Sequence, residues 1–314
     1  MDYDVIIIGG GPAGLTAALY ASRARQKTLV LESFSVVGQA IITDSIENYP
    51  GFPDGVNGFE LVGRFKKQAE KFGTILKTSH VKSIKEHKDK GHRGWKVVSE
   101  KEEFTTLSLI IASGARPKKL GVPGEDTLQG RGVSYCATCD GALYRDKDIV
   151  VVGGGDTAVE EALFLTKFGK KVSLVHRRDR LRATKILQER ALSNKKMSFL
   201  WESEAISILG EKKVESIRIR NIKGGQESDV VCDGVFIFVG YIPNTDLVKG
   251  IVKLDTSGYI LTDQDMNTSK KGVFACGDSR KKLLRQVITA CGDGATAAFS
   301  AQQYVEELKG TAYK

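Results

Sequence analysis

Cys136 and Cys139, separated by two residues, form the pattern in this chain best suited to reversible oxidation. A Cys-x-x-Cys pair at the start of a helix lowers the pKa of its exposed thiol, and the resulting thiolate attacks disulfides. Asp140 follows directly and could hand a proton to a leaving thiolate, a role compatible with that of a carboxylate at a helix N-terminus. The sequence therefore predicts a redox-active disulfide with an adjacent acid.

A half zinc site is the alternative for the same pair, because zinc would need two further ligands. The chain has four histidines, at positions 80, 87, 92 and 176, and none has the spacing that would supply them. The other three cysteines stand singly among apolar or small neighbours, which favours buried free thiols: Cys232, Cys276 and Cys291. We therefore expect no metal site and a single redox pair.

The dithiol lies between two glycine-rich turns, each in a strand-turn-helix-strand context. In the first, residues 4–8 form an apolar strand, residues 9–14 read Gly-Gly-Gly-Pro-Ala-Gly, and residues 15–24 are patterned as a helix. Glycine lets the backbone turn tightly and approach a pyrophosphate at the helix N-terminus. Glu32 ends the next strand, 23 residues after Gly9, where a carboxylate accepts hydrogen bonds from a ribose diol. The predicted contacts are Gly9, Gly11, Pro12, Ala13, Gly14 and Glu32.

The second turn, residues 153–158, follows strand 149–152 and precedes helix 159–168 and strand 171–175. His176 stands 23 residues after Gly153, in the place of the carboxylate, and three arginines cluster beside it. Guanidinium groups pair bidentately with a 2′-phosphate, so this copy predicts an NADPH site. The alternatives are an ordinary glycine turn and a solvated run of arginines. The predicted contacts are Gly153, Gly155, Asp156, Thr157, His176, Arg177, Arg178 and Arg182.

Composition agrees with an ordinary globular enzyme of about two domains, with 314 residues of which 41% are apolar. The first apolar run is too short to span a bilayer and lacks a basic leader, so we expect a cytoplasmic protein with no membrane partner. Lys and Arg number 47 against 38 Asp and Glu. Because the basic runs are short and lack interleaved aromatics, this excess favours an acidic protein partner over a nucleic acid.

Together these motifs resemble the low-molecular-weight, bacterial-type NADPH-dependent thioredoxin reductases, a class of pyridine nucleotide-disulfide oxidoreductases, over nearly the whole chain. The matching segments are 9–14, Glu-Asn-Tyr-Pro-Gly-Phe at 47–52, Cys-Ala-Thr-Cys-Asp at 136–140, His-Arg-Arg-x-x-x-Arg-Ala at 176–183 and Gly-Val-Phe-Ala-Cys-Gly-Asp at 272–278. The resemblance implies FAD in the first site, NADPH in the second, electron transfer through the Cys136–Cys139 disulfide to thioredoxin, and a homodimer.

The resemblance also implies further flavin contacts. Asp278 would contact the ribityl chain, and Arg285, Gln286 and Val287 would border the isoalloxazine. The remaining implied contacts are Gly38, Gln39, Asn48, Ala112, Gly114 and Gly277. Cys139 would face the flavin, which leaves Cys136 to attack the partner protein.

The expected fold is α/β, with two Rossmann-like three-layer dinucleotide-binding domains. Strand-like runs at 109–112 and 235–239 each end in a segment with glycine and proline, and we interpret these as two chain crossings. The FAD domain would then comprise residues 1–115 and 245–314, with an NADPH domain of 116–244 that carries the disulfide inserted into it. The resemblance implies that the inserted domain rotates between half-reactions, because nicotinamide, disulfide and partner each need access.

Three departures from the family pattern matter, and one of them, Cys276 and Cys291 where alanine is common, is interpreted as size-conserving packing. Ala142 and Leu143 stand where many members carry two aromatics, which keeps a glutaredoxin-like or peroxiredoxin-linked partner open. Val37 replaces a glycine in the turn before Gln39. A ferredoxin-driven reductase is disfavoured because it should lack the arginine cluster. A further alternative is a nucleotide sensor whose cysteines switch its association, which would bind NADPH without bleaching a bound flavin.

Overall fold

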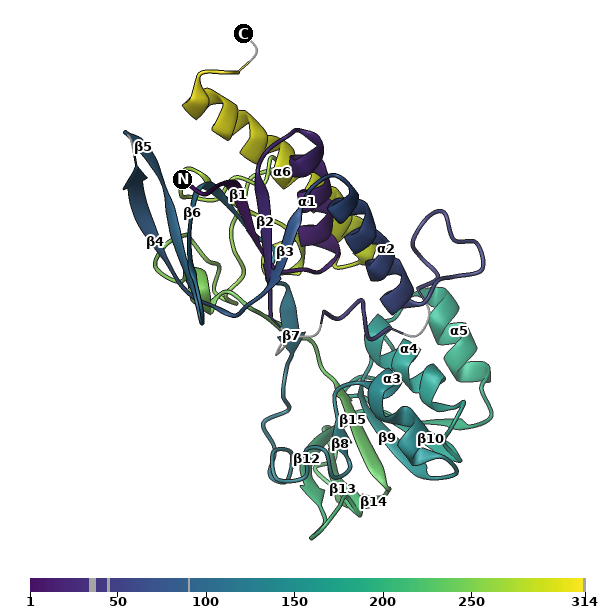
Figure 1. The fold of residues 1–314 in the computed structure, drawn as a ribbon. Helices are drawn as coiled ribbons and strands as arrows, with labels where there is room; N and C mark the ends of the chain where they lie inside the picture. The colour runs from purple at the N-terminus through teal and green to yellow at the C-terminus, as the bar shows by residue number, and fades with distance from the viewer. Residues whose placement is uncertain (34–37, 44–45, 90, 313–314) are drawn as a thin grey trace. The chain divides into compact units, whose positions relative to one another are not determined.

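The computed structural model describes residues 1–33, 38–43, 46–89 and 91–312. The chain divides into two compact units. We call residues 1–116 with 242–314 the outer unit, and residues 117–241 the inserted unit (Figure 1). At the two crossings, short strands β7 (Ala115–Pro117) and β16 (Tyr241–Pro243) pair with each other. Within the described residues, no helix has the length and apolar content needed to span a membrane.

The outer unit is built on a seven-stranded sheet in the order β3-β2-β1-β6-β5-β4, with β17 also paired to β6. Strands β1, β2, β3, β6 and β17 pair in parallel, whereas β4 and β5 extend the sheet in antiparallel fashion. The strands are β1 (Tyr3–Ile8), β2 (Thr28–Glu32), β3 (Ile75–Thr78), β4 (Val81–Asp89), β5 (His92–Ser99), β6 (Glu103–Ile111) and β17 (Val273–Ala275).

Both faces of this sheet are buried, which explains the uninterrupted apolar run of β1. Val5 and Ile7 pack with the alanines of α1 and α6, while Ile6 and Ile8 point into a second core on the opposite face. The helices are α1 (Pro12–Arg23), α2 (Gly58–Lys71) and α6 (Val287–Lys309), with 3₁₀ helices η2 (Asp246–Val248) and η3 (Gly277–Ser279). Figure 1 shows α1, α2 and α6 together on one side of the sheet.

The inserted unit repeats this plan with a parallel sheet in the order β11-β10-β9-β15-β8. Helix α4 packs on one face, and an antiparallel sheet in the order β12-β13-β14 packs on the other. The strands are β8 (Val133–Ser134), β9 (Asp148–Gly153), β10 (Lys171–Val175), β11 (Met197–Leu200), β12 (Ser203–Leu209), β13 (Ser216–Asn221), β14 (Glu227–Val231) and β15 (Gly234–Phe238). The helices are α3 (Ala137–Asp140), η1 (Gly141–Tyr144), α4 (Asp156–Leu165) and α5 (Lys185–Ser193).

Each unit therefore has the three layers of a Rossmann-like domain, which confirms the predicted α/β fold class. Because parallel strands end at the same edge of a sheet, the residues that follow β1, β2 and β6 are brought together in the outer unit. The residues that follow β9, β10 and β15 meet in the same way in the inserted unit. These two edges carry the candidate nucleotide sites.

Candidate active site

The first glycine-rich turn forms a cradle at the start of α1. Gly9 has a φ of +118°, and a Cβ there would overlap the backbone of Ala112 at the end of β6. A Cβ at Gly14 would overlap the carbonyl of Gly9, whereas nothing lies within 4 Å of the Cβ position at Gly11. Helix α1 begins at Pro12 without a side-chain cap. Its free amide groups and the open space beside Gly11 fit an approaching phosphate.

Glu32 lies against this turn, since a side chain at Gly10 would overlap its carboxylate. The Glu32 carboxylate also accepts a hydrogen bond from Lys66 of α2, with 3.1 Å between Nζ and Oε1. Sequence reasoning did not find Lys66, because this cation lies 34 residues away on another element. The arrangement suits a ribose diol held by Glu32 next to the phosphate cradle.

The remaining flavin contacts implied by the resemblance come from several parts of the outer unit. The Asn48 side chain donates to Gln286 Oε1 at 3.1 Å, so two of these implied contacts are hydrogen-bonded to each other. Gln286 caps α6, and Val287 is its first residue. Gly38 and Gln39 lie in a short turned segment after β2, and Val37 beside them lies outside the described residues. Gly114 has a φ of +65° and accepts a backbone hydrogen bond from Asn244.

Two polar atoms in this region are buried and lack a hydrogen-bond partner among the described residues. They are Oδ1 of Asp278, in η3, and Nε of Arg285. Burial raises the pKa of Asp278, while the nearby Lys282 and Arg285 cations act in the opposite direction. The Arg285 guanidinium stacks on the Tyr259 ring, 4.2 Å from its centroid. Unpartnered buried polar atoms are uncommon and fit a polar ligand such as a ribityl chain.

The second glycine-rich turn has the same construction in the inserted unit. Gly153 packs on Ala158 and on the carbonyl of Phe238, and Gly155 caps α4 without a side chain. The loop after β10 folds back over this turn. The Arg182 amide donates to the Gly154 carbonyl at 2.7 Å, and the Thr184 amide donates to the side-chain carboxylate of Asp156 at 2.6 Å.

His176 occupies the place that Glu32 has in the first copy, since a side chain at Gly154 would overlap its ring. The imidazole is buried, its Nε2 has no partner among the described residues, and burial lowers its pKa. Arg177, Arg178 and Arg182 are exposed, and none forms an ion pair with a described residue. Three unpaired cations beside a neutral ring fit a 2′-phosphate better than a bare ribose.

Cys136 and Cys139 form a disulfide, with Cys136 as the N-terminal cap of α3. The Cys139 amide donates to Cys136 Sγ at 3.1 Å. Such a donor stabilises a thiolate at Cys136 once the bond is reduced. Cys139 is exposed and Cys136 half-buried.

Asp140 is held by a residue that sequence reasoning missed. Ser134, buried at the end of β8, donates from Oγ to the Asp140 carboxylate at 2.7 Å, and accepts the amide of Cys136 at 3.1 Å. The one signal in the sequence that could have identified Ser134 is its position, two residues before the first cysteine.

The other cysteines are buried free thiols, as predicted. Burial raises the pKa of Cys232 to about 12, and it also raises the pKa of both Cys276 and Cys291. A thiol that stays protonated is a poor nucleophile. Among the described residues no group of three or more His, Cys, Asp or Glu side chains could hold a metal.

Known proteins match this chain over nearly its full length. Residues 3–294 match the family of pyridine nucleotide-disulphide oxidoreductases. The thioredoxin reductase of Peptoclostridium acidaminophilum is 47% identical over 310 residues, with 97% of each chain covered. Among solved structures, the thioredoxin reductase of Lactococcus lactis in its FR conformation has a TM-score of 0.93 at 46% identity, covering 97% of this chain and 99% of the other. That of T. acidophilum has a TM-score of 0.89 at 33% identity, covering 96% and 98%.

Proposed function

Because the chain belongs to the thioredoxin reductase family of pyridine nucleotide-disulphide oxidoreductases, we propose that it carries electrons from NADPH through FAD and the Cys136–Cys139 disulfide to oxidised thioredoxin. The single observation that carries the proposal is the disulfide itself, placed in the same inserted unit as a turn with three unpaired arginines. A nucleotide-binding module without redox chemistry has no use for this pair beside its coenzyme site.

We assign FAD to the outer unit and NADPH to the inserted unit. Gly9, Gly11 and Gly14 would hold the FAD pyrophosphate at α1, Glu32 the ribose, and Asp278 the ribityl chain. For NADPH, Gly153 and Gly155 would hold the pyrophosphate. The 2′-phosphate would lie beside His176 and be paired by Arg177, Arg178 and Arg182. Bound in this way, NADPH would supply a hydride and FAD would relay its two electrons to the disulfide.

The protein's own chemistry then consists of two thiol-disulfide exchanges. Two electrons and two protons convert the Cys136–Cys139 bond into two thiols. The Cys136 thiolate, next to the Cys139 amide, attacks one sulfur of the partner's disulfide, and the first partner thiolate leaves. Cys139 then attacks Cys136, which releases the second partner thiolate and restores the disulfide. Asp140, oriented by Ser134, would exchange the protons that these thiolates gain and lose.

We further propose that the two units change their mutual arrangement between these steps, because the nicotinamide and the disulfide cannot both lie against the flavin at once. One orientation would place the disulfide over the flavin, and the other would bring NADPH in and expose Cys136 to the partner protein. The crossings at 116–117 and 241–242 would serve as hinges, and Gly240 beside one of them has a φ of +117°. Replacing Gly240 with alanine strains that backbone without filling any space, since nothing lies within 4 Å of the added Cβ. The variant should keep flavin reduction by NADPH and slow multiple turnover.

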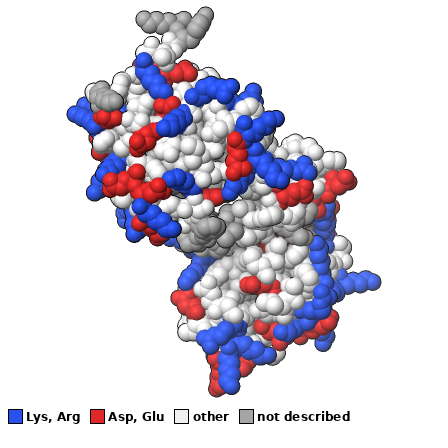
Figure 2. Space-filling view, in the orientation of Figure 1, with Lys and Arg blue, Asp and Glu red and all other residues white. Residues whose placement is uncertain are grey.

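The partner is proposed to be a thioredoxin, and the enzyme a homodimer. Figure 2 shows Lys and Arg interspersed with Asp and Glu on the visible face, so the net charge of +9 is not gathered into one large basic area there. The net positive charge of the whole chain should nevertheless speed its encounter with an acidic thioredoxin, and this effect should fade with added salt. Light scattering of the purified protein tests the dimer.

An NADPH oxidation assay tests the proposed function. Thioredoxin, a glutaredoxin-like protein and a peroxiredoxin-linked disulfide protein are supplied in turn, each with NADPH and with NADH. We expect fast NADPH oxidation with thioredoxin and much slower oxidation with NADH. Faster turnover of either other protein would reassign the partner, and equal use of NADH would contradict the assignment of the arginines.

A further inference from the structure

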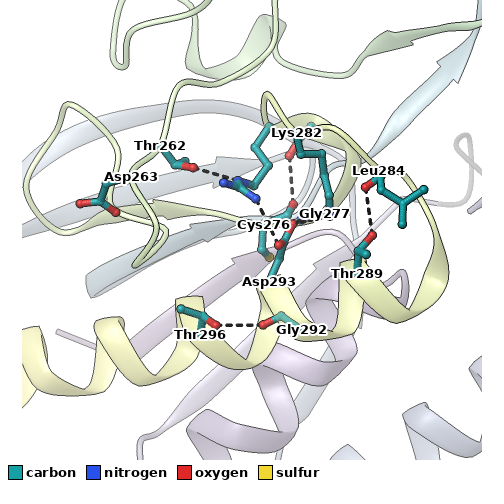
Figure 3. Close-up of polar contacts among 12 residues, drawn as sticks. Thr262, Asp263, Cys276, Gly277, Lys282, Leu284, Thr289, Gly292, Asp293 and Thr296 are labelled. Atoms are coloured by element: carbon teal, nitrogen blue, oxygen red, sulfur yellow. Dashed lines mark hydrogen bonds and ion pairs between the residues drawn. The ribbon is translucent and has the colours of Figure 1, made fainter. Parts of the chain in front are cut away.

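Asp293 lies in α6 at the centre of a buried charge network that none of the steps above uses (Figure 3). Its carboxylate accepts hydrogen bonds from Lys282 Nζ at 2.6 Å, from Arg280 Nη1 at 3.1 Å and from the Gly277 amide at 3.1 Å. The side chains of Asp293, Arg280 and Lys282 are only 11%, 13% and 7% exposed. One acid thus faces two cations in the interior of the outer unit.

Such a network is costly to bury unless its charges are all compensated. One of the two cations neutralises the charge of Asp293, so the three side chains together keep one net positive charge. The neighbouring acid is Asp278, which is buried and whose Oδ1 has no partner among the described residues. Lys282 acts on Asp278 as an attractive charge, against the burial of that carboxylate. Arg285 attracts Asp278 in the same way, whereas the Asp293 carboxylate repels it, so the spare positive charge of Lys282 helps to offset both the burial of Asp278 and that repulsion.

The network also fixes the backbone on which two predicted flavin contacts lie. Gly277, which precedes Asp278, has a φ of +71°, and a Cβ there would lie 2.8 Å from the Ala13 Cβ in the first turn of α1. Gly294, next to Asp293, packs directly on the backbone of Ala13. Asp293 therefore lies where the phosphate cradle, η3 and α6 meet.

The loop that carries Arg285 and Gln286 is tied to the same place. Arg280 and Lys282 anchor its start to Asp293, and Arg280 also donates to Thr262 Oγ1 at 2.8 Å. Its end is held by Thr289, which donates to the Leu284 carbonyl at 3.0 Å and forms a capping box with Gln286. Figure 3 shows Lys282 and Gly277 converging on Asp293, with Thr289 reaching Leu284 nearby.

We propose that Asp293, through Arg280, Lys282 and Gly277, is a positioning residue of the flavin site. It holds Asp278 and the Arg285 loop in the arrangement that binds the ribityl-isoalloxazine half of the cofactor, without touching the cofactor itself. The proposal rests on the proposed function, because it requires a flavin in the outer unit. It assigns Asp293 no part in binding the adenosine diphosphate half, which the turn at Gly9 and Glu32 would hold.

Binding to the apoprotein separates the two halves of the cofactor. FAD binding is measured by quenching of flavin fluorescence, and ADP binding by its competition with FAD. Asp293→Asn keeps the size of the side chain and an acceptor for the Gly277 amide, but removes the charge. We expect FAD affinity to fall about tenfold or more, since residues that orient direct ligands contribute on this scale. ADP affinity should stay within about twofold of the wild type.

Two further variants complete the test. Lys282→Met leaves the Arg280–Asp293 pair in place and should weaken FAD binding in the same direction, by less. Asp229→Asn breaks an exposed ion pair with Arg218 in the inserted unit and should change neither affinity. If Asp293→Asn does not fold, the FAD affinity of Lys282→Met alone tests the proposal.

The possible outcomes are distinct. Weaker FAD binding with unchanged ADP binding supports the proposal. Unchanged FAD affinity in Asp293→Asn, or in Lys282→Met if only that variant folds, overturns it, and so does an equal loss for FAD and ADP. A wild-type apoprotein that binds no FAD refutes the proposed function instead.

Discussion

The hydroxyl of Ser134 donates a 2.7 Å hydrogen bond to the carboxylate of Asp140, six residues along the chain. The same oxygen accepts the amide of Cys136 at 3.1 Å. One buried side chain therefore links the proposed proton carrier to the backbone of the proposed nucleophile. This link makes Ser134 the residue through which the orientation of Asp140 can be tested without removing the acid.

Ser134→Ala should lower the turnover of thioredoxin about tenfold, because a general acid contributes roughly 10²–10⁴ to a rate only when it is held within reach. The reduction of bound flavin by NADPH should be unaffected, since neither Ser134 nor Asp140 takes part in the hydride step. Stopped-flow absorbance separates the two rates. Ser134→Thr, which keeps the hydroxyl, should recover most of the turnover, and a slow threonine variant would contradict the role of the hydrogen bond.

Coenzyme choice should depend on the exposed arginines around His176. Arg178→Gln or Arg182→Gln should raise the KM for NADPH by about ten- to a hundredfold, the worth of one charge-assisted contact to a phosphate. The KM for NADH should hardly move, because NADH has no 2′-phosphate. Steady-state assays with both coenzymes give the comparison.

Arg180 provides the matched control for that experiment. It is exposed in the same loop but is not one of the three predicted phosphate contacts. Arg180→Gln should therefore leave both KM values near those of the wild type. Equal losses with NADPH and NADH in the Arg178 variant would show that the loop has been disturbed rather than a phosphate contact removed.

The fold class follows from the sequence because its signals are local. The apolar run of residues 4–8 fits a strand buried on both faces, and the glycine spacing places a turn and helix after it. The disulfide is predictable for the same reason, since its two cysteines lie three residues apart. The arginine cluster predicted NADPH, the resemblance added FAD, and the roles of individual contacts stay predictions.

The supporting contacts could not be predicted, because each joins elements that meet only in the folded chain. Asp293 is in the second turn of α6, and the sequence around it reads as an ordinary helix, yet its partners lie 11 to 16 residues earlier. Lys66 donates a hydrogen bond to Glu32 although 34 residues separate the two in the sequence. A charged residue in a helix normally indicates a solvated face, and only burial shows otherwise.

Acid conditions should destabilise the fold through His176. Burial lowers its pKa below the ordinary value of 6.5, so the unfolded chain binds more protons in the interval between the two pKa values. The free energy of unfolding should therefore fall as the pH drops below about 6.5. Urea unfolding at pH 7.5 and 5.5 measures this fall, which should be smaller in His176→Gln. Replacing the exposed His80 with glutamine should leave it unchanged.

Glu125 should matter for the stability of the inserted unit. This carboxylate is 2% exposed and accepts hydrogen bonds from the amides of Leu120 and Gly121 and from the Tyr135 hydroxyl at 2.6 Å. Burial, together with Glu125, raises the pKa of Tyr135 above its usual range. Because removal of the acceptor leaves buried donors unpaired, Glu125→Leu should cost about 3 kcal/mol of unfolding free energy.

The next residue, Asp126, is the control for Glu125. Its side chain is 73% exposed and pairs with Lys119 at the surface. Asp126→Asn should change the unfolding free energy by less than about 1 kcal/mol. If urea unfolding gave equal losses of unfolding free energy for Glu125→Leu and Asp126→Asn, the burial of Glu125 would not account for its contribution to stability.

Anaerobic mixing of the FAD-loaded enzyme with NADPH and then with oxidised thioredoxin tests the central claim most directly, when the wild type is compared with the Cys136→Ser, Cys139→Ser double variant. We predict that NADPH bleaches the flavin in both proteins, and that only the wild type recovers its colour while two thiols appear on thioredoxin. If the double variant reduced thioredoxin as fast as the wild type, electrons would reach the partner without the disulfide, and the relay would be wrong.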